Sequence, residues 1–441
     1  MSTSIDQANI DALLTFLAQS PSPYHASAQL AERFTAAGYT EVQEGDDWSS
    51  AATGRLCLRQ GGTFLAYRAG TEAPEQSGLR LLGAHTDSPN LRLKPQPLSP
   101  KQGFLQLGVE VYGSPLWHSW LDRPLSVAGR LVRMSETGPK ATLLRLTDAV
   151  CCIPDLAVHL NRKVNREGLR LNPQDHLQAI GGLAAHSCSD LAAWLQERLP
   201  ASDAARAHVD GPMGFDLCLF DTTAPSLIEG LHCWVQSARL DNLLSCFAAA
   251  EAMLHSPETS AGQVLICYDH EEVGSRSALG AASDLLGRVL RRLLSPSGHD
   301  PARWARTLAR SLFVSIDMAH ALHPHYADRH EAGHQPMLGA GPVLKRNAAQ
   351  SYATDAVTAA LVAHVAAERN LPLQHFVTRS DLPCGGTVGP IVASRLGIAS
   401  VDLGNPMLAM HSCRELADTA DLAPLVQLLK GLLQLEQVHV L

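Results

Sequence analysis

Hydrophobic residues recur at helical spacing near the beginning of the chain. Residues 5–19 carry apolar side chains three or four positions apart, at Ile10, Leu13, Leu14 and Leu17. This spacing is typical of one face of an amphipathic helix. The segment SPSPYH interrupts the pattern, and we expect a second helix over residues 26–37.

The next hydrophobic segments are shorter and read as strands. RLCLRQ and TFLAYRAG flank the pair Gly61-Gly62, an arrangement that predicts a hairpin. The apolar run LRLLGAH follows and ends at His85. We expect this run to be a buried strand because almost all of its side chains are apolar.

The second half of the chain alternates between strand and helix patterns. The predicted strands are VLICYD, LFVSID and ASVDLG, and the predicted helices between them are LLGRVLRRLL and TDAVTAALVAHVAAER. This alternation is typical of a parallel sheet with crossover helices. The predicted fold class is therefore α/β, with a central, mostly parallel sheet and helices on both faces.

The pattern of hydrophobic and turn residues differs in the middle of the chain. From about residue 95 to residue 232, short β-like segments alternate with turn residues, and only residues 190–199 have a clear helical pattern. We interpret residues 94–233 as an inserted β-rich domain. Residues 1–93 and 234–441 would then form one α/β domain.

Composition and charge narrow the function classes. The chain has 441 residues, 46% of them hydrophobic and 18% charged, and a formal net charge of −8. An acidic balance without basic blocks argues against binding to nucleic acid or anionic membranes. No run of about 18 uncharged apolar residues is present, and no secretion signal is recognisable. The ten cysteines form no C-x-x-C pair, so we expect a cytoplasmic protein with reduced cysteines.

Several acidic residues and histidines follow the predicted strands or precede a helix. Because loops at the carboxyl ends of parallel strands converge on one crevice, these residues are candidates for a single site. The candidates are His85, Asp241, Glu271, Glu272, Asp317 and His411.

This residue set suits two divalent metal ions. Zinc binds histidine nitrogen and carboxylate oxygen. Two histidines with three carboxylates would allow one bridging carboxylate, with one histidine and one carboxylate on each ion. Of the adjacent Glu271 and Glu272, one could bind metal while the other takes a proton from water. Asp87 is a candidate to orient His85, since metal-binding histidines usually donate their other N–H to an acceptor.

Each candidate also has an ordinary structural reading. His85 could be a hydrogen-bonded residue at a strand end, and Asp241 could cap the following helix. Glu271 and Glu272 could lie in a solvated loop, and local backbone donors could cap Asp317. The histidines of residues 320–334 are weaker metal candidates, mostly expected at the surface.

Five motifs occur in order along the chain and resemble the signatures of the aspartyl aminopeptidase family. They are GAHTDSPNLRLKP, DHEEVGSRSALGA, SIDMAHALHPHY, GPVLKRNAAQSYATD and GNPMLAMHS. The resemblance extends over essentially the whole chain. It implies a dinuclear zinc aminopeptidase that removes N-terminal acidic residues, Asp and perhaps Glu, from peptides. It also implies that the insert is a dimerisation domain and that the chain forms a homo-oligomer, usually a tetrahedral dodecamer.

The resemblance assigns roles to the candidate metal site. Asp241 corresponds to the bridging carboxylate and Glu271 to the general base. His85 with either Glu272 or Asp317 would bind one metal, and the remaining carboxylate with His411 would bind the other. Two zinc ions per subunit are expected, with manganese or cobalt possible at one site.

Further roles come from the same resemblance. Lys345 is similar to the lysine that meets the acidic side chain of the substrate, although Arg346 or Arg379 could serve instead. His159 is similar to a histidine that reaches the active site of a neighbouring subunit, although its polar surroundings also suit a solvated surface. The remaining expected substrate-pocket residues are His320 and Tyr352.

Two positions depart from the family pattern, and other functions stay open. His270 and His325 stand where asparagine is expected, which leaves the tuning of the metals undefined. The alternatives are an aminopeptidase of neutral specificity, a metal-dependent deacylase on the same scaffold, and a non-catalytic binding or assembly protein.

Overall fold

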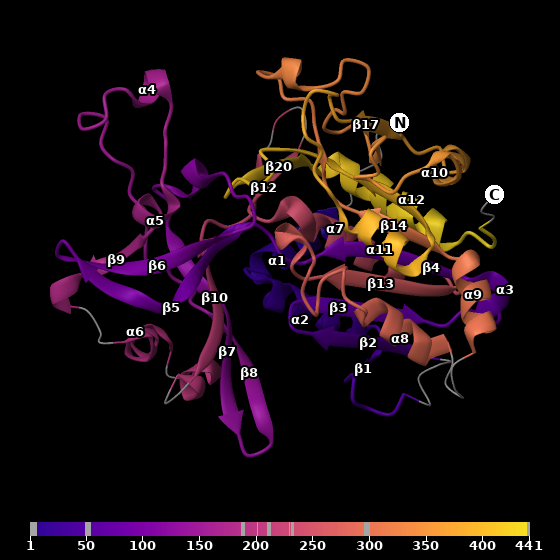
Figure 1. Cartoon of the computed structure of the whole chain (residues 1–441), viewed down its shortest axis with the longest axis horizontal. Coiled ribbons are helices and arrows are strands. Elements are labelled where there is room, and N and C mark those ends of the chain that lie inside the picture. The colour runs from indigo at the N-terminus through magenta and orange to yellow at the C-terminus, as the bar shows by residue number, and fades with distance from the viewer. Residues whose placement is uncertain are drawn as a thin grey trace. The chain divides into compact units, whose positions relative to one another are not determined.

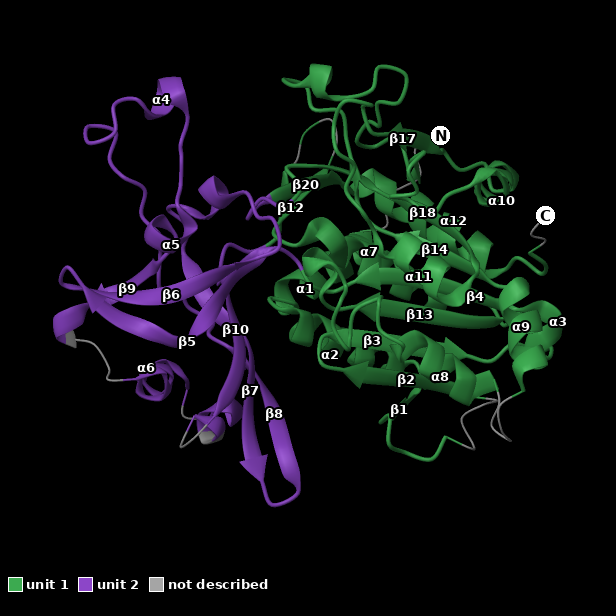
Figure 2. Cartoon of the chain, viewed as in Figure 1, with its two compact units in different colours: residues 1–87, 225–410, 415–441 green, residues 88–224, 411–414 purple. Residues whose placement is uncertain are grey.

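The computed structural model describes residues 7–48, 54–186, 190–200, 202–209, 213–228, 230, 233–294 and 300–438. The chain divides into two compact units (Figures 1 and 2). Unit 1 consists of residues 1–87, 225–410 and 415–441, and unit 2 of residues 88–224 and 411–414. None of the helices in the described ranges has the length and hydropathy of a membrane span.

A mixed, mostly parallel sheet forms the centre of unit 1 (Figure 1). In the described residues it has nine strands in the order β1-β2-β3-β13-β4-β14-β18-β16-β17. The central strands β13, β4, β14 and β18 are parallel to one another, and β3 and β16 run antiparallel to their neighbours in this core. Their bounds are β1 Thr40–Val42, β2 Arg55–Gln60, β3 Thr63–Arg68, β4 Leu79–His85, β13 Gly262–Tyr268, β14 Leu312–Ile316, β16 Val343–Arg346, β17 Gln374–Val377 and β18 Ala399–Gly404.

Helices cover both faces of this sheet because its strands are apolar on both sides. In β4, Leu79 and Leu81 belong to one buried cluster, and Leu82 and Ala84 belong to another. Such alternation follows from the two-residue period of a strand. The helices of unit 1 are α1 Gln7–Gln19, α2 Pro23–Ala36, α3 Pro74–Ser77, α7 Leu240–Leu254, α8 Leu285–Leu294, α9 Pro301–Ala309, α10 Ala356–Glu368, α11 Val388–Leu396 and α12 Leu422–Leu433.

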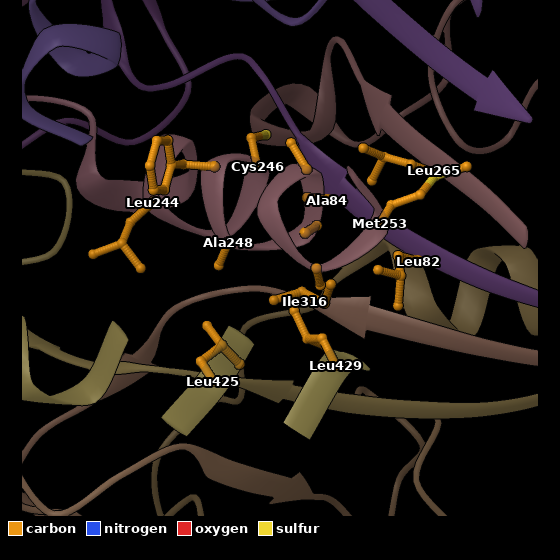
Figure 3. Close-up of a cluster of buried hydrophobic side chains, with 14 of the residues drawn as sticks. Leu82, Ala84, Leu244, Cys246, Ala248, Met253, Leu265, Ile316, Leu425 and Leu429 are labelled. Atoms are coloured by element: carbon orange, nitrogen blue, oxygen red, sulfur yellow. The ribbon is translucent and has the colours of Figure 1, made fainter. Parts of the chain in front are cut away.

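Helix α7 is the most deeply buried of the long helices in the described chain. Fourteen of its residues, 240–253, are buried. Figure 3 shows Leu244, Ala248 and Met253 of this helix among side chains from β4, β13, β14 and α12. A helix that is apolar on all sides belongs in a protein core, and this one carries Asp241 in its first turn.

Unit 1 also contains a smaller sheet, of five strands in the described residues, in the order β11-β12-β20-β19-β15. Its strands are only two to four residues long. They are β11 Ser226–Ile228, β12 Trp234–Ser237, β15 Ala319–His320, β19 Pro406–Leu408 and β20 Glu415–Asp418. Strand β15 begins two residues after Asp317, which directly follows β14.

Unit 2 is β-rich and has its own hydrophobic core. Its described strands form a six-stranded antiparallel sheet in the order β8-β7-β10-β5-β6-β9. The strands are β5 Asn90–Lys101, β6 Phe104–Tyr112, β7 Leu125–Ser135, β8 Gly138–Arg145, β9 Ala179–Leu183 and β10 Gly214–Asp221. The helices are α4 Val164–Glu167, α5 Pro173–His176 and α6 Leu191–Arg198.

The α/β fold class predicted from the sequence is confirmed, and the element boundaries differ in places. Helix α2 begins at Pro23, before the predicted start at Ala26, because the Ser22 side chain accepts a hydrogen bond from the His25 N–H. Proline at the first helical position needs no N–H partner, so SPSPYH starts a helix rather than only breaking one. The sequence patterns missed α9, α11 and α12 and the five-stranded sheet.

Candidate metal centre

The central parallel strands bring most of the candidate residues to one edge of the sheet. His85 is the last residue of β4, and its register partner in β13 is Tyr268. Glu271 and Glu272 follow β13 in a short 3-10 helix. Asp317 directly follows β14, which pairs in parallel with β4. The predicted convergence at the carboxyl ends of the strands therefore occurs for these four residues.

Asp241 reaches the same place from helix α7. The backbone at Asp241 and Asn242 is not helical, and the regular helix begins after them. The Asp241 N–H donates to Glu415 Oε2 at 3.1 Å, and Asn242 Nδ2 donates to the carbonyl of Ile316 at 2.8 Å. The start of α7 is thus attached to β20 on one side and to β14 on the other.

His85 lies at the centre of a ring of carboxylates. Its Nε2 atom is 3.5 Å from Asp241 Oδ1, 3.9 Å from Glu271 Oε2 and 3.9 Å from Asp317 Oδ1. The His85 side chain is 2% exposed and that of Glu271 16% exposed. His85 is buried and Glu271 largely shielded, which argues against a fully solvated acidic loop at Glu271.

Asp87 is fully buried and contacts His85 and the two glutamates that follow β13. Its Oδ1 and Oδ2 atoms accept the backbone N–H groups of Glu271 and Glu272, each at 3.1 Å. Its Oδ1 lies 3.5 Å from His85 Nδ1, while its backbone carbonyl is closer to that nitrogen, at 3.0 Å. Asp87 therefore fixes the turn that carries the two glutamates and also approaches His85.

Three acid groups of the site, Glu271, Glu272 and Asp317, have raised pKa values. Burial raises the pKa of Glu271 to about 8 and that of Asp317 to about 6, and neighbouring carboxylates add to both shifts. Burial, and next the Asp241 carboxylate, raise the pKa of Glu272 well above its usual value. Burial disfavours the charged form of His85, but Glu271 and the other nearby acids outweigh this effect and raise its pKa.

Divalent cations fit this donor set. Crowded carboxylates in a buried site retain protons unless positive charge compensates them. One group of possible ligand atoms, all within 4.8 Å of one another, comprises His85, Asp241 and Asp317, and a second comprises His85, Glu271 and Glu272. Nitrogen and carboxylate oxygen are the ligands that zinc takes in catalytic sites. None of the described metal-binding groups includes a histidine of residues 320–334.

The raised pKa values give a prediction for the metal-free protein. Burial raises the pKa of Glu271 from its ordinary value of 4.5 to about 8 and that of Asp317 from 3.8 to about 6. The folded state therefore binds more protons than the unfolded state over this range, and stability falls as pH rises. We expect the urea midpoint of metal-free protein to decrease steadily from pH 5 to pH 8. The urea midpoint of zinc-loaded protein should decrease much less over the same pH range. An equal dependence of the midpoint on pH in the two forms would contradict a metal site here.

His411 and His159 belong to unit 2. The Nδ1 atom of His411 is 3.1 Å from the Ser114 carbonyl, and the His411 carbonyl accepts the Leu116 N–H at 2.9 Å. His159 is exposed on a turn. The roles of both histidines stay predictions.

Lys345 and Tyr352 lie together in unit 1. The Lys345 side chain is buried on β16, where Nζ donates to the Met318 carbonyl at 3.2 Å and lies 5.0 Å from the centre of the Tyr352 ring. The Lys345 ammonium also lowers the pKa of Asp317, against the effect of burial. Of the alternatives to Lys345, Arg346 is exposed, and Arg379 binds both carboxylate oxygens of Asp381.

Unit 1 contains a cavity of about 290 Å³ that is lined in part by Phe376, whose ring contacts that of Tyr352. His320, predicted as a pocket residue, lines it and contacts the edge of the Phe376 ring at 5.7 Å between ring centres. The rest of the lining is mixed, with apolar residues such as Phe376 and Met407, the arginines Arg329 and Arg379, and the acid Glu331. The strand that carries His320 begins two residues after Asp317.

The two departures from the family pattern stand outside the ring. His270 Nδ1 lies 2.7 Å from Ser277 Oγ, and the His270 N–H donates to Asp269 Oδ1 at 2.9 Å. His325 is exposed. Neither residue displaces a candidate ligand.

Glu415 was missed from the sequence. It lies close to His411 in the chain, but its carboxylate meets the backbone of Asp241 only because β20 pairs with β12. In the sequence Glu415 is only a single glutamate after HSCR, and no pattern around it indicates a contact with Asp241.

Comparisons with known proteins identify the family of the chain. The family described as Aminopeptidase I zinc metalloprotease (M18) matches residues 16–433. A protein of Pseudomonas putida (strain GB-1), called "Probable M18 family aminopeptidase 2", is 47% identical over 425 residues, 95% of this chain and 96% of the relative. The corresponding protein of Pseudomonas paraeruginosa (strain DSM 24068 / PA7) is 46% identical over 419 residues, with the same coverage of both chains.

Solved structures agree as well. A chain from the cryo-EM structure of the Ape4 and Nbr1 complex is 34% identical, with a TM-score of 0.90, over 96% of this chain and 85% of that one. The S. cerevisiae mApe1 dodecamer is 26% identical, with a TM-score of 0.81, over 97% and 96% of the two chains. The chain therefore belongs to the M18 family and is a zinc metallo-aminopeptidase.

Proposed function

We propose that this aminopeptidase removes acidic N-terminal residues from short peptides and uses two zinc ions to do so. The observation that carries the metal chemistry is the buried ring of carboxylates around His85, whose raised pKa values call for compensating cations. The acidic preference rests on the resemblance to aspartyl aminopeptidases and on the buried ammonium of Lys345 near Asp317.

The ligand geometry favours one of the two assignments that the sequence left open. His85, Asp241 and Asp317 hold their ligand atoms within one group, so we assign Asp317 rather than Glu272 to the metal that His85 binds. Glu272 would then bind the second metal together with His411. Asp241 is the proposed bridge between the two.

The residues of the ring have different roles in peptide hydrolysis. Bound divalent cations polarise the substrate carbonyl and make water more acidic. Glu271 takes a proton from the attacking water while the oxygen of that water bonds to the carbonyl carbon. The C–N bond then breaks, and Glu271 passes the proton to the departing amine. Asp87 keeps Glu271 in place through the backbone hydrogen bond described above.

Substrate selection is assigned to the side of the site that carries Lys345. An ammonium group on a rigid strand attracts a carboxylate and is poorly matched to an apolar side chain. Tyr352 packs against Lys345 and restricts its movement. His320 and the adjoining cavity would contact the peptide beyond its first residue.

The proposed active form is a homo-oligomer. A structure similar to this chain is described as a dodecamer, and the exposed turn of unit 2 that carries His159 would reach the active site of a neighbouring copy. The solution mass of the purified protein tests this assembly, and a monomeric enzyme with full activity would exclude a role for a neighbour's His159.

Chromogenic peptides that differ only in the first residue test the specificity. We expect Asp-leading and Glu-leading peptides to be cleaved at least about 10²-fold more efficiently than Leu-leading and Ala-leading ones, because only an acidic side chain offers the Lys345 ammonium a carboxylate from the substrate. The measurement is kcat/KM for each peptide. Chelation should abolish all cleavage, and added zinc should restore it.

The variant Lys345→Met separates specificity from catalysis. It should remove most of the preference for acidic peptides and still leave chelator-sensitive cleavage of the neutral ones. Lys430→Met, at a helix surface, is the matched control. Preference for leucine in the wild type would favour the neutral aminopeptidase. Cleavage of acylated amino acids alone would favour the deacylase, and zinc binding without any turnover would favour the non-catalytic protein.

A further inference from the structure

Glu415 is a buried acid that none of the roles above includes. It is the first residue of β20 and is 2% exposed. Its register partner is Ser237, the last residue of β12, and the chain runs from there directly into α7. This pairing brings the Glu415 carboxylate to the backbone of Asp241, whose N–H it accepts at 3.1 Å.

Asp241 depends on such contacts because the helix does not hold it. Its φ and ψ angles of −79° and 105° lie outside the helical region. The Glu415 contact fixes the backbone on the Asp241 side, and the bond from Asn242 Nδ2 to the Ile316 carbonyl fixes it on the other. Between these two attachments the Asp241 carboxylate points toward His85 Nε2, 3.5 Å away.

The chemical nature of Glu415 adds a second argument. A neutral glutamine would accept the same N–H, so hydrogen bonding alone does not require an acid. A carboxylate close to Asp241 adds negative charge to a buried region that already holds Asp317 and Glu272. Such charge is costly without cations and favourable with them.

We propose that Glu415 is a positioning residue that fixes Asp241 and whose negative charge strengthens the binding of divalent cations at the adjoining site. The inference rests on the metal centre of the proposed function. Partners behind metal ligands typically contribute about 10- to 100-fold in metal affinity.

The test is titration of the full-length, metal-free protein with zinc ion alone in chelator-buffered solutions. The variant Glu415→Gln keeps the size and the acceptor and removes the charge, and we expect it to bind zinc about 10- to 100-fold more weakly. Glu415→Ala should bind more weakly still. Should the alanine variant fail to fold, the glutamine variant alone decides the matter. Glu436→Gln, an exposed position in the same unit, should bind zinc like the wild type.

A second readout separates positioning from general stability. The metal-free melting temperature of Glu415→Gln should equal or exceed that of Glu436→Gln, because the buried charge of Glu415 is unfavourable when no cation compensates it. Wild-type zinc affinity in Glu415→Gln would overturn the inference and leave the proposed function intact. Failure of the wild type to bind zinc at all would instead overturn the proposed function.

Discussion

Replacing Glu271 with glutamine is expected to lower kcat by about 10²- to 10⁴-fold, the usual contribution of a general base. The amide has nearly the same size and cannot accept a proton from water. The backbone bond from residue 271 to Asp87 Oδ1 does not involve the side chain, so the turn should stay in place. Without metal, burial raises the pKa of Glu271 to about 8, a direction that favours acceptance of a proton by this side chain.

Kinetics and metal content together decide this prediction. KM should change little, and zinc bound per chain should stay at the wild-type value, because Glu272 and Asp317 supply the assigned carboxylate ligands. Glu368→Gln, an exposed position on α10, is the matched control. A Glu271→Gln enzyme that keeps its kcat would assign the proton transfer to another group. Loss of zinc in this variant would make Glu271 a ligand.

The strands that carry the site could be predicted from the sequence because each is a short, continuous apolar run. LRLLGAH and LFVSID are buried on both faces, and such runs end where the polar ligands begin. His85 and Asp317 could therefore be placed at one edge of the sheet without any contact being known. The same reasoning placed Glu271 and Glu272 after β13.

The contacts that hold the ligands could not be predicted, because they join segments far apart in the chain. Strands β15, β19 and β20 have two to four residues, which is too short for an alternating pattern to be recognised. The attachment of Asp241 to Glu415 exists only through the pairing of β20 with β12. Likewise, nothing in the sequence indicates that the Asp87 carboxylate accepts two consecutive N–H groups from Glu271 and Glu272.

Lys345 illustrates the same limit for a single side chain. A lone lysine in a polar motif is usually exposed, and the sequence left Arg346 and Arg379 as equal candidates. In the structure Lys345 is buried on β16, whereas Arg346 in the same strand is exposed. Adjacent strand residues face opposite sides, but the strand has only four residues, so its inward face could not be recognised from alternation.

Among single substitutions in the ring, Asp241→Asn should cause the largest loss of kcat/KM. Asp241 is the proposed bridging ligand, so the variant weakens the binding of both cations at once. Catalysis by metal ions is worth several kcal/mol. We expect kcat/KM to fall at least about 10³-fold, since each tenfold corresponds to about 1.4 kcal/mol. Zinc bound per chain, measured after dialysis against a weak chelator, should fall well below the wild-type value. Asp11→Asn, at an exposed position of α1, is the control.

The stability of Asp241→Asn distinguishes loss of a ligand from misfolding. Without metal, the Asp241 carboxylate raises the pKa values of Glu272 and Asp317, which marks it as a source of repulsion. Its neutralisation should therefore keep or raise the melting temperature of the metal-free protein at pH 8, while stabilisation by added zinc should largely disappear. A variant that melts lower than the wild type without metal would mean that Asp241 supports the fold itself. A variant that binds zinc like the wild type would exclude Asp241 as the bridge, because a bridging ligand cannot be lost without weakening both cations.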